Sequence, residues 1–180
     1  METVKKPSGF LKRFIRDEEA SATVEFVILV PMVMWVVFSV IEAGWLSTQQ
    51  TMLNRGLNLA VRDLRLGKDA GKTPLEIRQD VCDYAGILRN CMSNLTLQLV
   101  RIENPIGGLT APCANRNASV DPTVTFNPGS HVDQDIMVAR VCYVVDPLIP
   151  GAGFGAALPR DALTGGYHMV SYSAFANEPL

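Results

Sequence analysis

One long apolar run constrains this sequence more than any other feature. Residues 26–41 are apolar except for Ser39. Continued to Leu46, the run gives about 31 Å of helix, enough to cross the hydrocarbon core of a membrane. Glu25 stands directly before it, although a lone acid at mid-depth costs roughly 2.5–3.5 kcal/mol and usually marks a function. The sequence therefore predicts a transmembrane helix over residues 21–46, with one acid near its beginning.

The charges on the two sides of the run predict its orientation. Residues 1–16 carry five basic residues and one acid, whereas Arg55 is the only charged residue in positions 43–61. The positive-inside rule places the N-terminus in the cytoplasm and residues 47–180 across the membrane. A removable secretory signal is the alternative, but the run is long for that role and no A-x-A pattern follows it.

The residues around the start of the run resemble a known processing signal. Ala20 is followed by four residues and then by Glu25 and Phe26, after a short basic leader over residues 1–20. This arrangement resembles the signal of type IV pilin-like proteins. The wider string FIRDEEASATVEFVILVP is similar to the TadE-like pseudopilins of the tight-adherence (Flp-type) pilus system. The resemblance implies that a membrane prepilin peptidase cuts between Ala20 and Ser21, although such families usually have Gly before the cut.

The same resemblance implies a function and a location. It implies a structural, non-enzymatic minor pilin or pseudopilin in a bacterial inner membrane, with a periplasmic head. Its partners would be the prepilin peptidase, other pseudopilins, the major pilin, the inner-membrane assembly platform and membrane lipid. By resemblance to type IV pilins, Glu25 would pair with the terminal amine of a neighbouring subunit and guide register.

Two questions stay open at this point. The sequence does not tell whether the protein enters the filament, primes it or stays in the membrane. Glu25 also has a simpler interpretation, as an interfacial residue at the cytoplasmic edge, reached by snorkelling or by Arg16.

Beyond the membrane the sequence predicts an α+β head. Leu53, Leu57, Ala60 and Leu64 recur on one helical face, so the first helix should continue through residues 47–66 and stop at Gly67. A second helix should begin at residue 74, where Thr73, Pro74 and Glu76 form a capping box with proline at the first position. Its expected buried face is Leu75, Ile77, Val81, Cys82, Ala85 and Leu88.

Three later segments have strand character. They are residues 94–102, 135–145 and 167–175, separated by loops rich in proline, glycine and asparagine at 104–130 and 147–166. The middle segment is apolar on both faces and rich in valine, so it reads as a central strand. The expected arrangement is a small antiparallel sheet with the helices on one face.

All four cysteines follow the apolar run. They are Cys82, Cys91, Cys113 and Cys142, an even number in a region expected to face an oxidising compartment, which favours two disulfides. Four cysteines allow three connectivities, and the sequence alone does not choose among them. We favour Cys82–Cys91, which closes a short loop around Gly86, together with Cys113–Cys142, which ties a loop to the central strand.

No pattern in the sequence indicates a catalytic, cofactor or metal site. The net charge of −2 gives no indication of a nucleic-acid partner. Residues 151–156 fit G-x-G-x-x-A, but prolines surround them, so we predict a loop. His131 and His168 lie far in sequence from any cysteine or carboxylate cluster with ligand spacing, and we expect no metal. The alternative functions are a single-pass membrane-anchored periplasmic binding or sensor domain and, with less support, an anchored enzyme.

Overall fold

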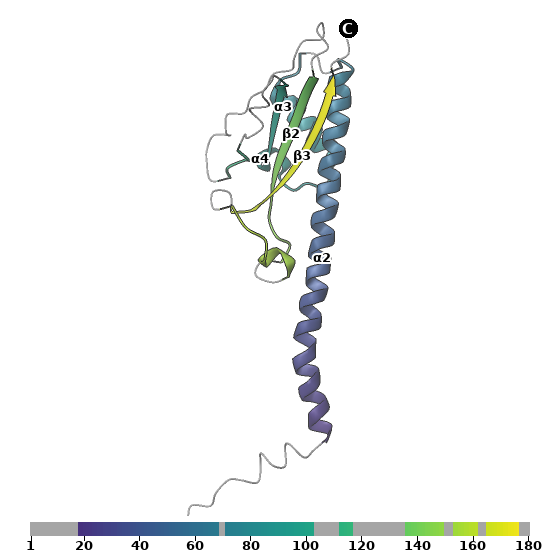
Figure 1. The fold of residues 1–180 in the computed structure, drawn as a ribbon, viewed down its shortest axis with the longest axis vertical. Helices are drawn as coiled ribbons and strands as arrows, with labels where there is room; N and C mark the ends of the chain where they lie inside the picture. Colours follow the sequence, from purple (N-terminus) through teal and green to yellow (C-terminus); the bar gives the residue numbers. More distant parts are fainter. Residues whose placement is uncertain are drawn as a thin grey trace, which may run out of the picture.

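One helix runs the length of the molecule, and a small head packs on its C-terminal half (Figure 1). The computed structural model describes residues 18–68, 71–102, 112–116, 136–149, 153–161 and 165–176, with only the backbone for residues 18–21. The basic leader up to residue 17, His131 and most of the predicted loop at 104–130 lie outside the described residues. The predicted α+β class is confirmed by the described elements, which are α2 (Glu18–Arg65), α3 (Pro74–Ala85), α4 (Cys91–Asn94), β1 (Leu95–Arg101), β2 (Ile136–Val145), the 3-10 helix η1 (Phe154–Ala156) and β3 (Tyr167–Ala176).

Helix α2 is a single element of 48 residues that joins the apolar run to the head. Pro31 lies inside it without ending it. The helix ends where the sequence predicts, because Gly67 adopts a φ of 69° that favours glycine. The amides of Gly67 and Lys68 then donate to the carbonyls of Leu64 and Asp63, both at 3.1 Å, and satisfy two carbonyls of the last turn.

Helix α3 begins at the predicted capping box. The Thr73 hydroxyl accepts from the Glu76 amide at 3.3 Å, and the Glu76 carboxylate accepts from the Thr73 amide at 2.6 Å. The helix ends at Gly86, whose φ is 69° and whose amide donates to the Cys82 carbonyl. The predicted buried face is wrong at Leu75, which is 57% exposed in the first turn.

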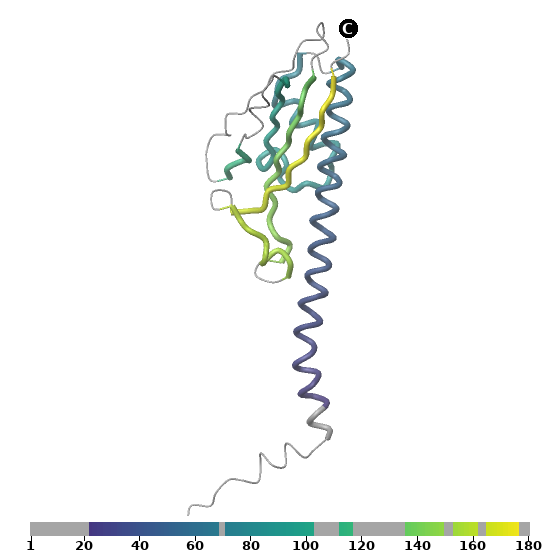
Figure 2. Tube along the Cα trace, in the orientation of Figure 1, coloured from purple at the N-terminus to yellow at the C-terminus, as the bar shows by residue number. Residues whose placement is uncertain are grey.

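The three strands form an antiparallel sheet in the order β1-β2-β3, so the predicted central strand is central. Leu97 pairs with Val141 across the first ladder, and Cys142 pairs with Val170 across the second. In the tube trace of Figure 2, β3 and the C-terminal half of α2 run side by side. The core lies between the helices and one face of the sheet, and its most buried side chains are Leu53, Leu57, Ile77, Val81, Leu95, Leu99, Met137, Val141 and Tyr143.

Candidate functional site

The two halves of α2 have opposite surroundings. From Leu53 onward its apolar face is buried in the core, whereas large apolar side chains stay exposed along residues 24–41. Phe26 is 67% exposed, and Glu25 is exposed one residue before it. Among the described residues one helix, Ala22–Arg65, is long and apolar enough to cross a membrane. No part of its most apolar stretch is buried against the head. The first half of α2 is therefore a candidate membrane anchor.

The predicted processing site lies at the beginning of this exposed half. Ala20 and Ser21 are helical in backbone conformation, in the first turn of α2. Glu25 follows one turn later, so an amine freed at Ser21 would lie about 6 Å from Glu25 along the helix axis. This offset places an acid and a potential amine close to the same end of a bare apolar helix. The described residues offer Glu25 no hydrogen bond or ion pair from the head.

Another acid on α2, Glu42, has surroundings opposite to those of the exposed Glu25. Glu42 is fully buried, with 0% exposure, and its Oε2 accepts the Gly155 amide hydrogen at 2.6 Å. The Gly155 carbonyl in turn accepts a short hydrogen bond from the Tyr167 hydroxyl. We call Glu42, Gly155 and Tyr167 the Glu42 clasp. It joins α2, η1 and β3 at the end of the head nearest the apolar run (Figure 1).

The Glu42 clasp depends on glycine at two positions. A Cβ on Gly155 would lie 2.7 Å from the Glu42 Cδ, and one on Gly153 would lie 2.9 Å from Glu42 Oε2. Gly153 also has a φ of 77°, which side chains rarely adopt. These glycines belong to residues 151–156, which the sequence predicts to be a loop. That prediction is wrong in part, because Phe154–Ala156 forms a turn of 3-10 helix that packs on α2, while residues 151 and 152 lie outside the described residues.

Both disulfides have the connectivity favoured from the sequence. Cys82 and Cys91 are joined with a Cα–Cα distance of 5.7 Å, because the chain turns at Gly86. Cys113 and Cys142 are joined at 5.4 Å and hold the segment 112–116 on the central strand. Close by, Arg116 Nη1 contacts the two carboxylate oxygens of Asp146 at 2.7 and 2.8 Å.

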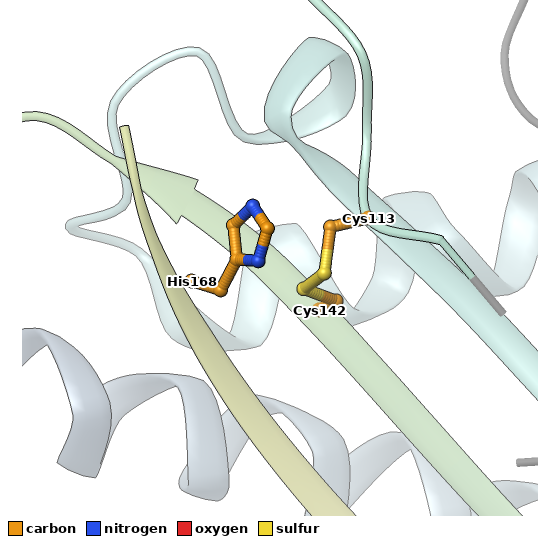
Figure 3. Close-up of side chains that lie close together, drawn as sticks. All are labelled: Cys113, Cys142 and His168. Atoms are coloured by element: carbon orange, nitrogen blue, oxygen red, sulfur yellow. A yellow bond between two sulfur atoms is a disulfide. The ribbon is translucent and has the colours of Figure 1, made fainter. Parts of the chain in front are cut away.

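His168 lies beside the second disulfide, although it is far from the cysteines in sequence. Its ring nitrogen and the sulfurs of Cys113 and Cys142 lie within 4.8 Å of one another (Figure 3). Val144 pairs with His168 two residues after Cys142, so the antiparallel register creates this proximity. The two sulfurs are bonded to each other, and a metal would need them as thiolates. The cluster therefore does not act as a metal centre in this oxidised form.

Glu42 is a functional candidate whose role the sequence pattern alone does not reveal. A signal was available, because Glu42 interrupts the predicted membrane helix, as an acid within 21–46, in the same way as Glu25. The partner was not visible, since Gly155 lies 113 residues away and contributes only its backbone amide. Local patterns identify an acid that needs a partner, but they do not identify a backbone group as that partner.

Comparison with known proteins adds one match. A family model described as TadE-like protein matches residues 20–62, which cover nearly all of α2. No curated protein and no solved structure matches the chain. The matched segment includes Ala20, Ser21, Glu25 and Phe26, on which the sequence resemblance was based, and it supports a role in the tight-adherence pilus system. The resemblance is confirmed over residues 20–62, which are similar to the TadE-like family.

Proposed function

We propose that this protein is a non-enzymatic minor pilin or pseudopilin that takes part in assembly of a tight-adherence pilus. The observation that carries the proposal is the division of α2 into a bare apolar half and a half buried in the head. The family match lies on this helix rather than on the sheet. A protein whose matched part is an exposed apolar helix is suited to packing among lipids and other helices.

The proposal includes an orientation and a location. The basic residues before the apolar run favour a cytoplasmic N-terminus in the inner membrane, with the head in the periplasm. Two disulfides in the head agree with an oxidising compartment. Its proposed partners are a prepilin peptidase, other pseudopilins, the major pilin and the assembly platform.

Glu25 is the proposed assembly residue. Cleavage after Ala20 would leave a positively charged amine on Ser21 near neutral pH. Within a low-dielectric helix bundle, an unpaired carboxylate is costly, and a charge-paired one is much less so. A Glu25 that pairs with the Ser21 amine of a neighbouring subunit would therefore favour one register between the two helices. Glu42 does not compete for this role, because it is fully buried within the subunit and its Oε2 already accepts from the Gly155 amide.

The experiment compares variants within the same exposed half of α2. Glu25→Ala and Glu25→Gln remove the charge, and Ser39→Ala removes a different polar group from the same apolar run. All three should reach the membrane at normal levels, since each makes the helix less polar or leaves it unchanged in charge. Only the Glu25 variants should lose pili, as counted by electron microscopy of the host.

Two results would contradict the proposal. Normal piliation in Glu25→Gln would support the interfacial interpretation of Glu25. Normal piliation after deletion of the whole gene would favour a single-pass membrane-anchored periplasmic binding or sensor domain instead.

A further inference from the structure

The η1 lobe, defined as residues 146–149 and 153–161, has an apolar surface that the head does not bury. The sequence contains no charged or polar side chain between Asp146 and Arg160. Leu148 and Phe154 are 48% and 45% exposed. Apolar surface left exposed to water is less favourable than buried surface by roughly 25 cal/mol per Å². A segment without charged or polar side chains therefore indicates an apolar partner.

Contacts with α2 fix the height of the η1 lobe along the helix. A Cβ on Gly153 would lie 3.6 Å from the backbone C and O of Phe38, and Gly155 is bonded to Glu42. Phe38 belongs to the apolar run and lies about 12 Å before Leu46 along the helix axis. In Figure 2 the lobe lies below the sheet, beside the middle of α2. The lobe is therefore level with the last turns of the predicted membrane helix.

The Glu42 clasp makes this position compatible with a nearby membrane. An exposed carboxylate at this height would draw water and oppose contact with lipid. Glu42 is instead fully buried between α2 and Gly155. Trp45, which is 36% exposed, lies on α2 one turn after Glu42, where an interfacial aromatic side chain is favourable.

We propose that the η1 lobe is a membrane-binding surface that places Phe154 and Leu148 in the interface of the leaflet next to the head. The depth is interfacial, because loop backbone amides need water or protein partners and do not enter hydrocarbon exposed to lipid. The occupant is lipid rather than protein, because the lobe is continuous with the helix face that the membrane would already surround. This inference rests on the proposed function, since it requires α2 to span the membrane.

The chain's two tryptophans, Trp35 and Trp45, allow a direct test in full-length protein reconstituted into phosphatidylcholine vesicles. Trp35→Phe with Trp45→Phe gives a background without tryptophan. Into it we would introduce, one at a time, Phe154→Trp, Leu148→Trp and the control Leu75→Trp. Leu75 is similarly exposed but lies in the first turn of α3, a helix that packs on α2 at Gly56, well beyond the apolar run. Trp45→Phe alone keeps Trp35 in the apolar run as the control for membrane insertion.

Quenching by lipids brominated at shallow or deep acyl positions reports the depth of each tryptophan. We expect Phe154→Trp and Leu148→Trp to lose fluorescence most with shallow bromines, and Leu75→Trp to lose none. Strong quenching of Trp35 without quenching at 148 or 154 would overturn the membrane-binding lobe and leave the anchor intact. Absence of quenching at Trp35 would overturn the membrane anchor itself, and the lobe with it.

Discussion

Two acids on one helix show how position decides the role of a carboxylate. Glu25 is exposed on the bare half of α2, whereas Glu42 is buried and accepts a backbone hydrogen bond. A buried carboxylate without such a partner would be strongly unfavourable. Glu42 therefore acts within the subunit, whereas Glu25 is the acid that we propose for pairing with a neighbouring subunit.

The Glu42 clasp can be tested by comparing two substitutions at one residue. Glu42→Ala leaves the buried Gly155 amide without an acceptor, which should cost about 1–3 kcal/mol. Glu42→Gln keeps a carbonyl oxygen in reach of that amide, so its loss should be clearly smaller. Hydrogen exchange at Gly155 is the measurement. Equal protection of this amide in both variants would show that the Glu42 side chain does not hold the loop.

The surroundings of Asp63 predict that the free energy of unfolding depends on pH through the contact between α2 and α3. Its Oδ2 accepts the Tyr84 hydroxyl at 2.8 Å, and Lys68 lies 3.3 Å from Oδ1. The Tyr84 hydrogen bond is the larger cause that lowers the pKa of Asp63 below its usual value, and the ammonium of Lys68 lowers it further. Because the folded pKa is the lower one, this stabilisation is fully present above the unfolded pKa, near 3.9. It is lost as the pH falls through the folded value.

The measurement is denaturant unfolding of detergent-solubilised protein between about pH 3 and 6. Asp63→Asn should remove this part of the acid destabilisation. Tyr84→Phe, which keeps the carboxylate but removes its donor, should remove most of it. An acid profile that is the same in wild type and Asp63→Asn would assign the pH dependence to other groups.

At the scale of elements, α2 and α3 meet through a glycine. A Cβ on Gly56 would lie 2.6 Å from the Val81 carbonyl oxygen and 3.1 Å from the Ala85 Cβ. Gly56→Ala should therefore destabilise the head by about 1–3 kcal/mol through overpacking. Gly44→Ala is the matched control on the same helix, because its Cβ would meet nothing within 4 Å. It should instead stabilise by roughly 0.5–1 kcal/mol. Thermal unfolding that moves in the same direction for both variants would contradict this contact.

The two disulfides close loops of different length, which predicts different contributions. The pairs are separated by 9 and 29 residues. The chain-entropy model gives about 2.6 kcal/mol for Cys82–Cys91 and about 3.6 kcal/mol for Cys113–Cys142. Replacing both cysteines of the longer loop with alanine should lower the free energy of unfolding more than replacing both of the shorter loop. Non-reducing peptide mapping of native protein is the control, and four free thiols would contradict both the bridges and the proposed periplasmic head.

The elements that the sequence predicted correctly are those with local signals. The capping box at Thr73 and Glu76 and the glycine after α2 set helix ends from within a few residues. The features that it missed depend on residues far apart in the chain. The contact of Glu42 with Gly155 and the approach of His168 to Cys142 follow from how η1 packs on α2 and from the pairing of β2 with β3. Leu75 fits the apolar spacing of α3 and is nevertheless exposed, because helical spacing does not reveal where the opposing surface ends.

At the scale of the whole molecule, helix α2 has different surroundings along its two halves. Its C-terminal half supplies one side of the head's core, so the head cannot separate from α2 without exposing Leu53 and Leu57. Its N-terminal half carries the apolar run and the predicted processing site. The first half is thus connected to the head without an intervening loop.

This continuity also bears on processing, because the bond between Ala20 and Ser21 lies in the first turn of α2. A peptidase that cuts an extended segment must first unwind that turn. We expect cleavage after Ala20 when the cognate prepilin peptidase is co-expressed, with an intact mass that corresponds to loss of residues 1–20. Ala20→Gly should speed the cut for two reasons, since glycine lacks the Cβ and lowers helix stability by about 0.8–1 kcal/mol.

Ala22→Gly separates these two causes. It weakens the same turn by a similar amount but leaves the Ala20 side chain before the scissile bond. If unwinding limits the reaction, both variants should be cut faster than wild type. If the Cβ of Ala20 limits it, only Ala20→Gly should be faster. An unchanged mass in wild type and in both variants, with an active enzyme that still cuts its major pilin, would contradict processing at this site.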